Sequence, residues 1–336
     1  MQDRKLLFQK LTATKIVNGL KLISGYYASR ITRKPLQWGM PISMSIEPTT
    51  ACNLGCPECP SGLKQFSRPT GNLDPKLFEK IIEQVKDTLV YLTFYFQGEP
   101  FINKNFLKMV KYASDKKIFT ATSTNAHFID DTVAEEIIHS GLDHLIISMD
   151  GTTQEVYEQY RVHGHLDKVL QGTENIIAAK KRLNSATPKV IFQFLVVKHN
   201  EHQIDDLYEL ADKMGVDQVA LKTAQVYDYK NGSPLFPTNE KYSRYKKNKD
   251  GLFEIKNKLR NHCWRLWHST VITWDGDLVP CCFDKDAKYK MGTIQNQSFK
   301  DIWHDDTYKA FRNSIIQSRK NIDICQNCTE GTKVWM

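Results

Sequence analysis

The feature that most constrains the fold is a regular alternation of strand-like and helix-like stretches from residue 42 to residue 222. The predicted strands are 42–48, 90–97, 118–124, 144–150, 189–197 and 216–222, and the predicted helices are 74–87, 105–117, 131–141, 166–183 and 203–215. Such alternation implies a parallel sheet with right-handed crossovers. Six strands are two short of a closed eight-stranded barrel. We therefore predict an α/β fold with a partial, open (β/α)6 TIM-like barrel and functional groups at the carboxyl ends of its strands.

The other segments differ in character from this core. Residues 1–41 form an N-terminal extension, and residues 223–262, which contain SPLFPT and KYSRYKKNK, break the rhythm and are predicted to be a linker or lid. Residues 263–336 form a small cysteine-rich module. It begins with a predicted hairpin, STVITWDGDLVPCC, which turns at Asp275-Gly276, and continues into helical sequence at 298–317.

Positive charge is concentrated at the N-terminus. Residues 1–34 hold eight Lys or Arg against Asp3, so they contribute 8 − 1 = +7 of the net charge of +8. The remainder is nearly neutral, which argues against a nucleic-acid-binding surface. Apolar residues recur at near-helical spacing between the basic ones: Leu6, Leu7, Leu11, Val17, Leu20 and Ile23. This pattern predicts a basic amphipathic helix that either packs on the protein's own body or lies on a membrane surface.

The cellular setting is inferred from what the sequence lacks. No apolar run approaches the roughly 18 residues that span a bilayer, and residues 1–34 do not resemble a signal peptide. We therefore expect a cytoplasmic protein, membrane-peripheral if the N-terminal helix binds lipid. In that setting the eight cysteines are reduced, and metal ligation is a better explanation for them than disulfides.

Three cysteines lie close together just after the first predicted strand. They are Cys52, Cys56 and Cys59 in the stretch CNLGCPEC. A cubane iron–sulfur cluster needs four ligands, so three thiolates leave one iron free to bind a substrate or cofactor. A zinc site would need a fourth ligand nearby, whereas the next cysteine is Cys263. The spacing therefore favours an open 4Fe-4S cluster over zinc.

This C-x3-C-x2-C motif at the first strand of a (β/α)6 pattern resembles the signature of the radical S-adenosylmethionine (radical SAM) enzymes. The resemblance covers about residues 42–222. It implies that S-adenosylmethionine chelates the open iron and is cleaved to methionine and a 5′-deoxyadenosyl radical, which takes hydrogen from the substrate. It also implies a one-electron reductant such as flavodoxin or ferredoxin.

Further positions resemble the cofactor-binding residues of the same family. Those matched are Gly98, Glu99 and Pro100 after the second strand, Ser123 and Asn125 after the third, Ser148 and Asp150 after the fourth, and Arg161. The first segment resembles a GGEP motif that contacts the methionyl amino group, but its first glycine is replaced by Gln97. The alternatives are strand-end caps for Ser123 and Asn125, a turn at Asp150, and a surface ion pair for Arg161.

Five cysteines remain in the C-terminal module. Cys325 and Cys328 form a CxxC pair, and Cys281 follows Gly276 on the returning hairpin strand. Cys282 points to the other face of that strand and is expected to be a buried apolar residue. With Cys263, the set resembles a SPASM extension of the shortened, twitch type, which implies one auxiliary 4Fe-4S cluster; structural zinc is the alternative.

Two reactions compete within this resemblance. One is oxidation of a small molecule, such as a sugar or aminocyclitol alcohol, with the auxiliary cluster accepting an electron. The other is modification of a peptide or protein. Residues 1–41 are too short for a separate peptide-binding module, which favours a small or lipid-linked substrate. A non-catalytic iron–sulfur or zinc-binding regulator is the alternative of another class. No general base is evident, because Arg265, Trp267 and Trp274 are better explained by packing.

Overall fold

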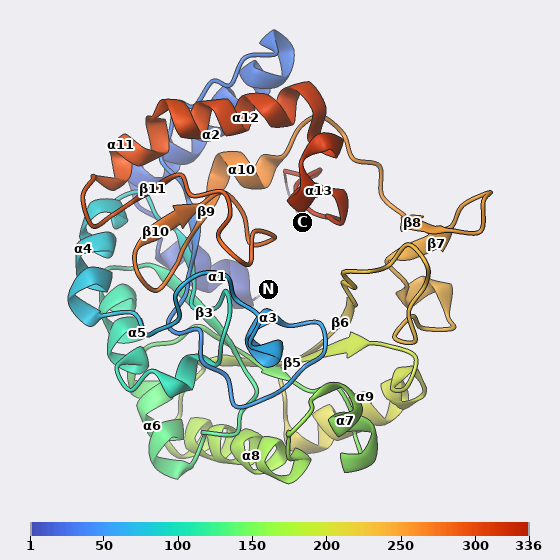
Figure 1. The fold of residues 1–336 in the computed structure, drawn as a ribbon. Helices are drawn as coiled ribbons and strands as arrows, with labels where there is room; N and C mark the ends of the chain where they lie inside the picture. Colours follow the sequence, from blue (N-terminus) through green and yellow to red (C-terminus); the bar gives the residue numbers. More distant parts are fainter. Residues whose placement is uncertain (1, 335–336) are drawn as a thin grey trace.

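The six predicted core strands are present in a computed structural model that describes residues 2–334, with side chains from residue 5. They are β1 (Ser43–Ile46), β2 (Tyr91–Thr93), β3 (Phe119–Thr124), β4 (His144–Ser148), β5 (Lys189–Val196) and β6 (Gln218–Thr223). Each pairs in parallel with the next in chain order, and the strands curve into an open ring (Figure 1). The predicted partial barrel is therefore confirmed.

Helices between these strands cover the outside of the ring (Figure 1). They are α4 (Pro75–Val85), α5 (Phe106–Asp115), α6 (Asp131–His139), α8 (Leu166–Arg182) and α9 (Ile204–Met214), each close to its predicted range. The Asp74 carboxylate accepts the backbone N–H groups of Lys76 and Leu77, so it caps the start of α4. Short elements at the mouth were not predicted: α3 (Pro60–Leu63), α7 (Gln154–Tyr160), and the 3-10 turns η1 (Pro100–Ile102) and η2 (Glu201–Gln203).

The C-terminal hairpin is continuous with the barrel sheet rather than a separate unit. Strand β9 (Ser269–Ile272) pairs in parallel with β1, and β10 (Asp277–Val279) and β11 (Gly292–Thr293) follow it in antiparallel order. The nine-stranded order β11-β10-β9-β1-β2-β3-β4-β5-β6 leaves β11 and β6 as edges. The module therefore extends the ring on the β1 side, and the barrel stays open at β6.

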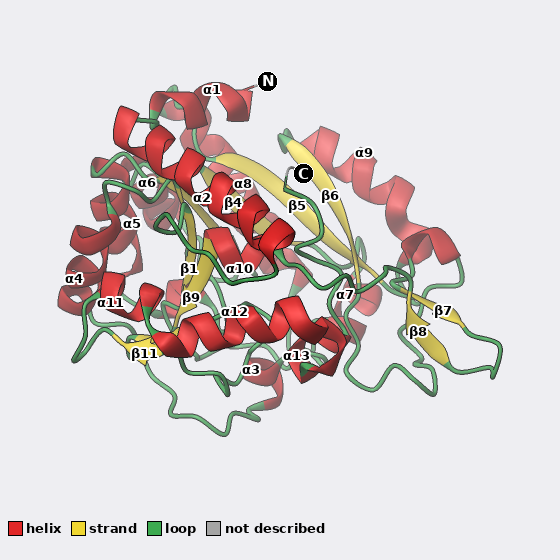
Figure 2. Ribbon diagram, turned by 90° about the horizontal axis from the view of Figure 1, so that it is seen from above, coloured by secondary structure: helices red, strands yellow, loops and turns green. Residues whose placement is uncertain are grey.

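Helices complete the C-terminal module around this hairpin. They are α10 (Trp264–His268), α11 (Phe299–His304), α12 (Asp306–Ser318), the 3-10 turn η4 (Arg319–Asn321) and α13 (Asp323–Gln326). The helical sequence predicted at 298–317 forms two helices, because Asp305 leaves helical geometry and its carboxylate caps α12 at the Tyr308 N–H. After this break, α12 runs across the module toward α13 (Figure 2).

The segment predicted as a linker or lid has a small core of its own. It contains the 3-10 turn η3 (Glu240–Tyr242) and a hairpin of β7 (Tyr245–Lys247) and β8 (Phe253–Ile255). The Tyr245 ring is buried and stacks on Tyr229 and Phe236. The hairpin stands out from the open side of the barrel beside β6 (Figure 1).

The N-terminal extension folds as α1 (Gln2–Gln9) and α2 (Ala13–Thr32), with the longer helix lying along the body (Figure 2). Of the two alternatives predicted for its apolar residues, packing on the protein's own body is wrong for Val17 and Leu20, which are 51% and 60% exposed. Buried polar side chains hold α2 instead. The Lys15 ammonium donates to the Lys117 carbonyl, and the Asn18 amide bonds both backbone groups of Met40.

Met1 and residues 335–336 lie outside the described part of the chain, as do the side chains of Asp3 and Arg4. Among the described helices, none has the length and apolar character of a membrane span.

Candidate iron–sulfur and cofactor site

The three clustered cysteines lie in the loop that follows β1, at the carboxyl-end mouth of the barrel. Cys56 is buried with Leu54 and Tyr160, and Cys52 and Cys59 pack against the same cluster. Two backbone hydrogen bonds pin the loop: Gly55 N–H donates to the Val162 carbonyl, and Glu99 N–H donates to the Ala51 carbonyl. The fold therefore gathers the three thiols as the sequence predicted.

The electrostatics of this loop suit a bound cation-rich group. Burial, with smaller contributions from Glu99 and the neighbouring thiols, raises the pKa of Cys52 to about 12, although a hydrogen bond from the Leu54 backbone lowers it. Burial also raises the pKa of Cys56, against the lowering effect of Arg161, whose Nη1 lies 3.7 Å from the sulfur. Within residues 2–334, no three His, Cys, Asp or Glu side chains converge on one metal-ion position. A cubane binds each thiolate at a different iron, so it needs no such common point, and the donor set fits it.

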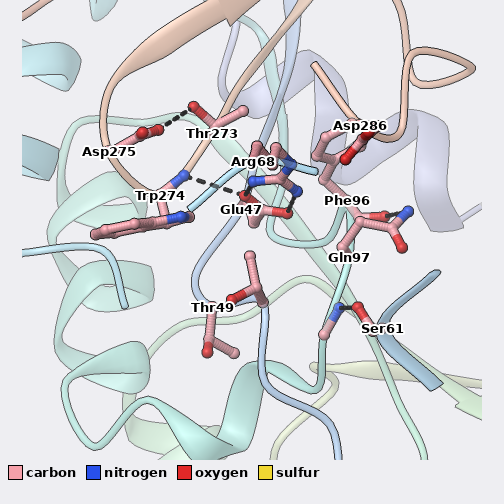
Figure 3. A network of polar contacts seen from close by, with 12 residues as sticks. Glu47, Thr49, Ser61, Arg68, Phe96, Gln97, Thr273, Trp274, Asp275 and Asp286 are labelled. Carbon is pink, nitrogen blue, oxygen red and sulfur yellow. Dashed lines mark hydrogen bonds and ion pairs between the residues drawn. The ribbon is translucent and has the colours of Figure 1, made fainter. Parts of the chain in front are cut away.

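A buried ion pair fixes the strand end from which the cysteine loop departs. Glu47 follows β1, is fully buried, and accepts two hydrogen bonds from Arg68, at 2.8 and 2.5 Å (Figure 3). The Trp274 N–H donates to the same carboxylate at 3.2 Å, which ties β1 to the β9–β10 turn. Burial raises the pKa of Glu47, and Arg68 opposes this rise. Sequence reasoning missed this pair, because nothing in the pattern linked Glu47 to a partner across the loop.

The segment after β2 approaches the cysteine loop closely, as its resemblance to GGEP implies. Gly98 has a φ of +75°, and a Cβ there would lie 2.3 Å from the Thr49 carbonyl oxygen. Its N–H donates to Ser61 Oγ at 2.8 Å (Figure 3). Gln97, which replaces the family's first glycine, is buried with its amide oxygen 3.9 Å from the Cys59 sulfur. The close backbone approach therefore occurs at Gly98, despite Gln97.

Glu99 joins the ends of β2 and β3. Its carboxylate accepts the Asn125 N–H at 2.8 Å and the Thr124 hydroxyl at 2.7 Å. Burial raises its pKa to about 7, although these hydrogen bonds lower it. The Asn125 side chain then donates to Asn53 in the cysteine loop at 2.8 Å. Pro100 is buried at the start of η1. A buried carboxyl beside the cysteines can receive a cationic amino group.

Asp150 and Arg161 form a second buried pair at the mouth. Arg161 Nε donates to Asp150 Oδ2 at 2.5 Å, and the Leu195 N–H donates to Oδ1 at 2.6 Å. The pair is not on the surface, since the Asp150 and Arg161 side chains are 1% and 18% exposed. Ser148 is buried at the end of β4, and Ser123 is half-buried near the end of β3. All eight matched positions thus lie at or beside the same mouth.

Four of the five C-terminal cysteines line one cavity. They are Cys263, Cys281, Cys325 and Cys328, together with Arg265 and Arg319. Burial raises the pKa of Cys325 to about 11 and of Cys328 to about 12. Arg319 Nη2 lies 3.1 Å from the Cys328 sulfur, which places a cation beside the thiols. Four thiols around an apolar, cation-flanked space fit a closed cluster.

Cys282, which directly follows Cys281, is not one of these four cysteines. Cys282 does not line that cavity; its sulfur lies 3.4 Å from Arg265 Nη1. Arg265, Trp267 and Trp274 are the three candidates near the hairpin, and of these Arg265 is the one that contacts a cysteine. Trp267 and Trp274 donate their indole N–H groups to backbone carbonyls, of Leu36 and Pro69, and serve packing.

A groove lies between the two sets of cysteines, and sequence reasoning did not find it. It encloses about 840 Å³ and is lined by residues from three parts of the chain: Pro57, Glu58 and Leu63 from the cysteine loop and α3, Tyr227 and Tyr229 from the segment after β6, and Phe283, Lys285 and Ile324 from the C-terminal module. Glu58 accepts the Tyr227 N–H at 3.0 Å, which joins two of these parts. A substrate held here would contact both halves of the molecule.

Two family models match the chain. The Radical SAM superfamily model covers residues 46–211, and SPASM, described as an iron–sulfur cluster-binding domain, covers residues 263–329. The two matches coincide with the barrel that carries the first cysteines and the module that carries the second.

The chain is also similar to curated proteins. The tungsten-containing aldehyde ferredoxin oxidoreductase cofactor-modifying protein of Pyrococcus furiosus is 26% identical over 316 residues, 84% of this chain and 86% of that protein. Mycofactocin maturase MftC of Mycobacterium ulcerans is 32% identical over 52% of this chain and 45% of its own length. PqqA peptide cyclase of Gluconobacter oxydans is 25% identical over 60% of this chain. The chain spans about half the length of these last two relatives.

Solved structures share the fold at low sequence identity. BtrN, in complex with AdoMet and 2-DOIA, matches with a TM-score of 0.54 and 19% identity over 88% of this chain and 95% of that one. Streptococcus suis SuiB, bound to precursor peptide SuiA, matches with a TM-score of 0.63 and 16% identity over 89% of this chain and 73% of that one. These likenesses establish the barrel and its extension.

Proposed function

Because the chain joins a radical SAM domain to a SPASM domain, it belongs to the radical SAM superfamily, and we propose that it is a maturase that oxidises a peptide substrate. Its cofactors are a 4Fe-4S cluster, an auxiliary iron–sulfur cluster and S-adenosylmethionine. When bound, S-adenosylmethionine and the first cluster supply a radical that removes hydrogen. The residues of this chain would bind these cofactors and position the substrate beside them.

The observation that carries the proposal is the groove between the two cysteine sets. It is open, about 840 Å³ in volume, and lined by aromatic rings and by charges of both signs, including Glu58, Lys230 and Lys285. This open lining, with rings and charges of both signs, suits an extended peptide that carries varied side chains. Among the similar curated proteins, one is named a maturase and one a peptide cyclase, which supports the same choice over the small-molecule oxidation that the sequence favoured.

We assign the cluster ligands from their placement. Cys52, Cys56 and Cys59 would hold the first cluster and leave one iron for S-adenosylmethionine. The auxiliary cluster would be held by Cys263, Cys281, Cys325 and Cys328, which line one cavity. Four thiolates leave no iron open, so the auxiliary cluster would serve the reaction as an electron acceptor and not as a substrate ligand.

The cofactor contacts are assigned to the mouth of the barrel. The buried Glu99 carboxyl, which is held by Thr124 and Asn125, would accept the methionyl amino group. Gly98 would present its backbone there, and Ser123 and Ser148 would bound the site from β3 and β4. Arg161, positioned by Asp150 beside Cys56, would supply the cation for the cofactor carboxylate.

The proposal is tested with extract from cells that lack the gene, in which the substrate accumulates. The extract is divided, and one half is digested with a broad protease that is then removed. Each half is added to reduced, reconstituted enzyme with S-adenosylmethionine, and 5′-deoxyadenosine is measured. A peptide substrate predicts stimulation by the undigested half that is lost after digestion, together with a loss of hydrogen mass from one peptide.

Two results would overturn the assignment. Stimulation that survives digestion and passes a filter of small cut-off would return the protein to small-molecule oxidation. Failure of the reduced enzyme to cleave S-adenosylmethionine at all would favour a non-catalytic iron–sulfur regulator.

Tyr227→Ala and Lys285→Ala in the groove should lower the stimulated rate, whereas Tyr208→Ala, which changes an exposed tyrosine on α9, should not.

A further inference from the structure

The outward face of α2 carries a row of exposed apolar side chains. Its members are Ile16, Val17, Leu20, Tyr27 and Ile31, which are 43–82% exposed and which we call the α2 outer face. Most are separated by four or seven residues, so they lie along one side of the helix. Phe8 on α1 and Trp38 just beyond α2 are exposed as well, at 70% and 52%.

The exposed row is not the side of α2 that packs on the protein. The opposite side of α2 is buried against the body through Leu22, Gly25 and Tyr26. Lys15 and Asn18 fix the helix rotation by donating to carbonyl groups elsewhere in the chain, and Lys10 pairs with Asp143. Rotation that buried the row would break these bonds, so the apolar residues are held outward by the fold itself.

A cationic pocket opens beside the end of the same helix. It encloses about 480 Å³ and is lined by Arg30, Arg33, Arg260 and His262 among others. Within the part of the chain with described side chains, none of the three arginines has a carboxylate partner. The Tyr26 hydroxyl bonds His262 Nδ1 at 2.9 Å, and His262 Nε2 is buried without a partner. Converging donors without acids suit an anionic group such as phosphate.

The sequence around the row carries no negative charge. No Asp or Glu occurs between Asp3 and Glu47, whereas Lys21, Arg30, Arg33 and Lys34 flank the apolar residues. Two kinds of contact together hold a protein on an anionic bilayer. Apolar side chains insert among the acyl chains, and neighbouring cations bind the phosphate headgroups. Tyr27 and Trp38 suit the headgroup level, where amphipathic rings concentrate.

We propose that the α2 outer face and the neighbouring arginine pocket dock this protein on an anionic phospholipid bilayer, with a headgroup phosphate in the pocket. A bilayer fits better than a protein partner, because the exposed apolar side chains of α2 lie beside a polar pocket lined by Arg30 and Arg33, which matches acyl chains beside phosphate headgroups. Membrane docking of this kind is independent of the peptide oxidation proposed for the barrel.

The test is co-sedimentation of the full chain with large vesicles of phosphatidylcholine alone or with about 30% phosphatidylglycerol, at low and high salt. Anionic vesicles should sediment the protein, and salt or removal of phosphatidylglycerol should release it. Leu20→Ser with Ile31→Ser, and Arg30→Gln with Arg260→Gln, should each weaken binding about ten-fold or more. The matched controls are Leu183→Ser with Leu252→Ser and Lys213→Gln with Lys249→Gln, which change exposed residues elsewhere. Circular dichroism and iron content confirm that each variant is folded.

Several outcomes would overturn the proposal. Equal binding to neutral vesicles, or equal loss in the control pairs, would show non-specific adsorption. A dimer in light scattering that is broken by Leu20→Ser with Ile31→Ser, without vesicle binding, would assign the face to a second copy. Binding that inorganic phosphate abolishes, but that the apolar pair leaves unchanged, would reduce the surface to a soluble-phosphate pocket.

Discussion

Asp150 accepts a hydrogen bond from Arg161 Nε at 2.5 Å in a position where the carboxylate is almost fully buried. Removing one member of a buried pair leaves the other charge without compensation and costs about 3–5 kcal/mol. Arg161→Gln should therefore lower the free energy of unfolding by about 3 kcal/mol, since Arg161 keeps some exposure. Anaerobic urea unfolding measures this.

The matched control is the Arg182–Glu135 pair, whose side chains are 47% and 45% exposed. Arg182→Gln should cost less than about 1 kcal/mol, because water screens an exposed pair. Equal losses in the two variants would show that the Asp150–Arg161 pair has no special role in stability.

Glu99 should make stability depend on pH. Burial raises its pKa from 4.5 to about 7, so the folded protein binds this proton more tightly than the unfolded chain does. The stabilisation is fully present below about pH 4.5 and is lost as the pH rises through about 7, with a span of about 3 kcal/mol. Relative to Glu99→Gln, the apoprotein should lose stability between about pH 5 and about pH 8. Parallel pH profiles for the two proteins would contradict this prediction.

Gly331 lies against a proposed cluster ligand. It has a φ of +77°, and a Cβ at this position would lie 2.4 Å from Cys263 Sγ. Gly331→Ala should displace the thiol and lower the iron content from about eight to about four per chain. Gly251 is a close control, since its φ is +79° and nothing lies within 4 Å of an added Cβ. Gly251→Ala bears the same backbone strain and should keep all its iron; a loss of iron in both would assign the effect to strain.

Two adjacent cysteines allow a sharper test of the auxiliary site. Cys281 lines the cavity with three other cysteines, whereas Cys282 contacts Arg265. Cys281→Ala should leave about four irons per chain, and Cys282→Ala about eight. The reverse result would exchange their roles. One zinc and no iron in the anaerobically prepared protein would reject both clusters.

The barrel was predictable because each strand and helix carries its own periodic signal. The C-terminal hairpin was predictable as a hairpin, but its place in the barrel sheet was not. The pairing of β9 with β1 joins residues more than 220 positions apart, and nothing in the four residues Ser269–Ile272 identifies β1 as their neighbour. Non-local register is set by the whole core and not by the strand itself.

The failures at α2 and at Glu47 have a common cause. Periodicity assigns apolar residues to the buried side, but α2 buries Lys15 and Asn18 because carbonyl groups of distant segments satisfy them. Likewise, Glu47 is buried because Arg68 meets it. Such partners come together only in the folded chain. The metal-ligand candidates were easier to find, since thiolate chemistry is recognisable from residue type and spacing.

The auxiliary cluster should determine what fraction of hydrogen-abstraction events yields oxidised product. After hydrogen abstraction, an oxidised product requires that the substrate lose one further electron and a proton. The groove contacts both the first cysteine loop, through Pro57 and Glu58, and the C-terminal module, through Ile324 and Asn327, so an acceptor in the module would be near the substrate.

Cys325→Ala with Cys328→Ala should therefore still release 5′-deoxyadenosine but form little product. The measurement is the ratio of product to 5′-deoxyadenosine, in protein shown to retain about four irons and its fold. Gly331→Ala should lower this ratio in the same way if it also loses the cluster, whereas Cys282→Ala should keep it unchanged. A ratio that is unchanged in the double variant would limit the second cluster to a structural role.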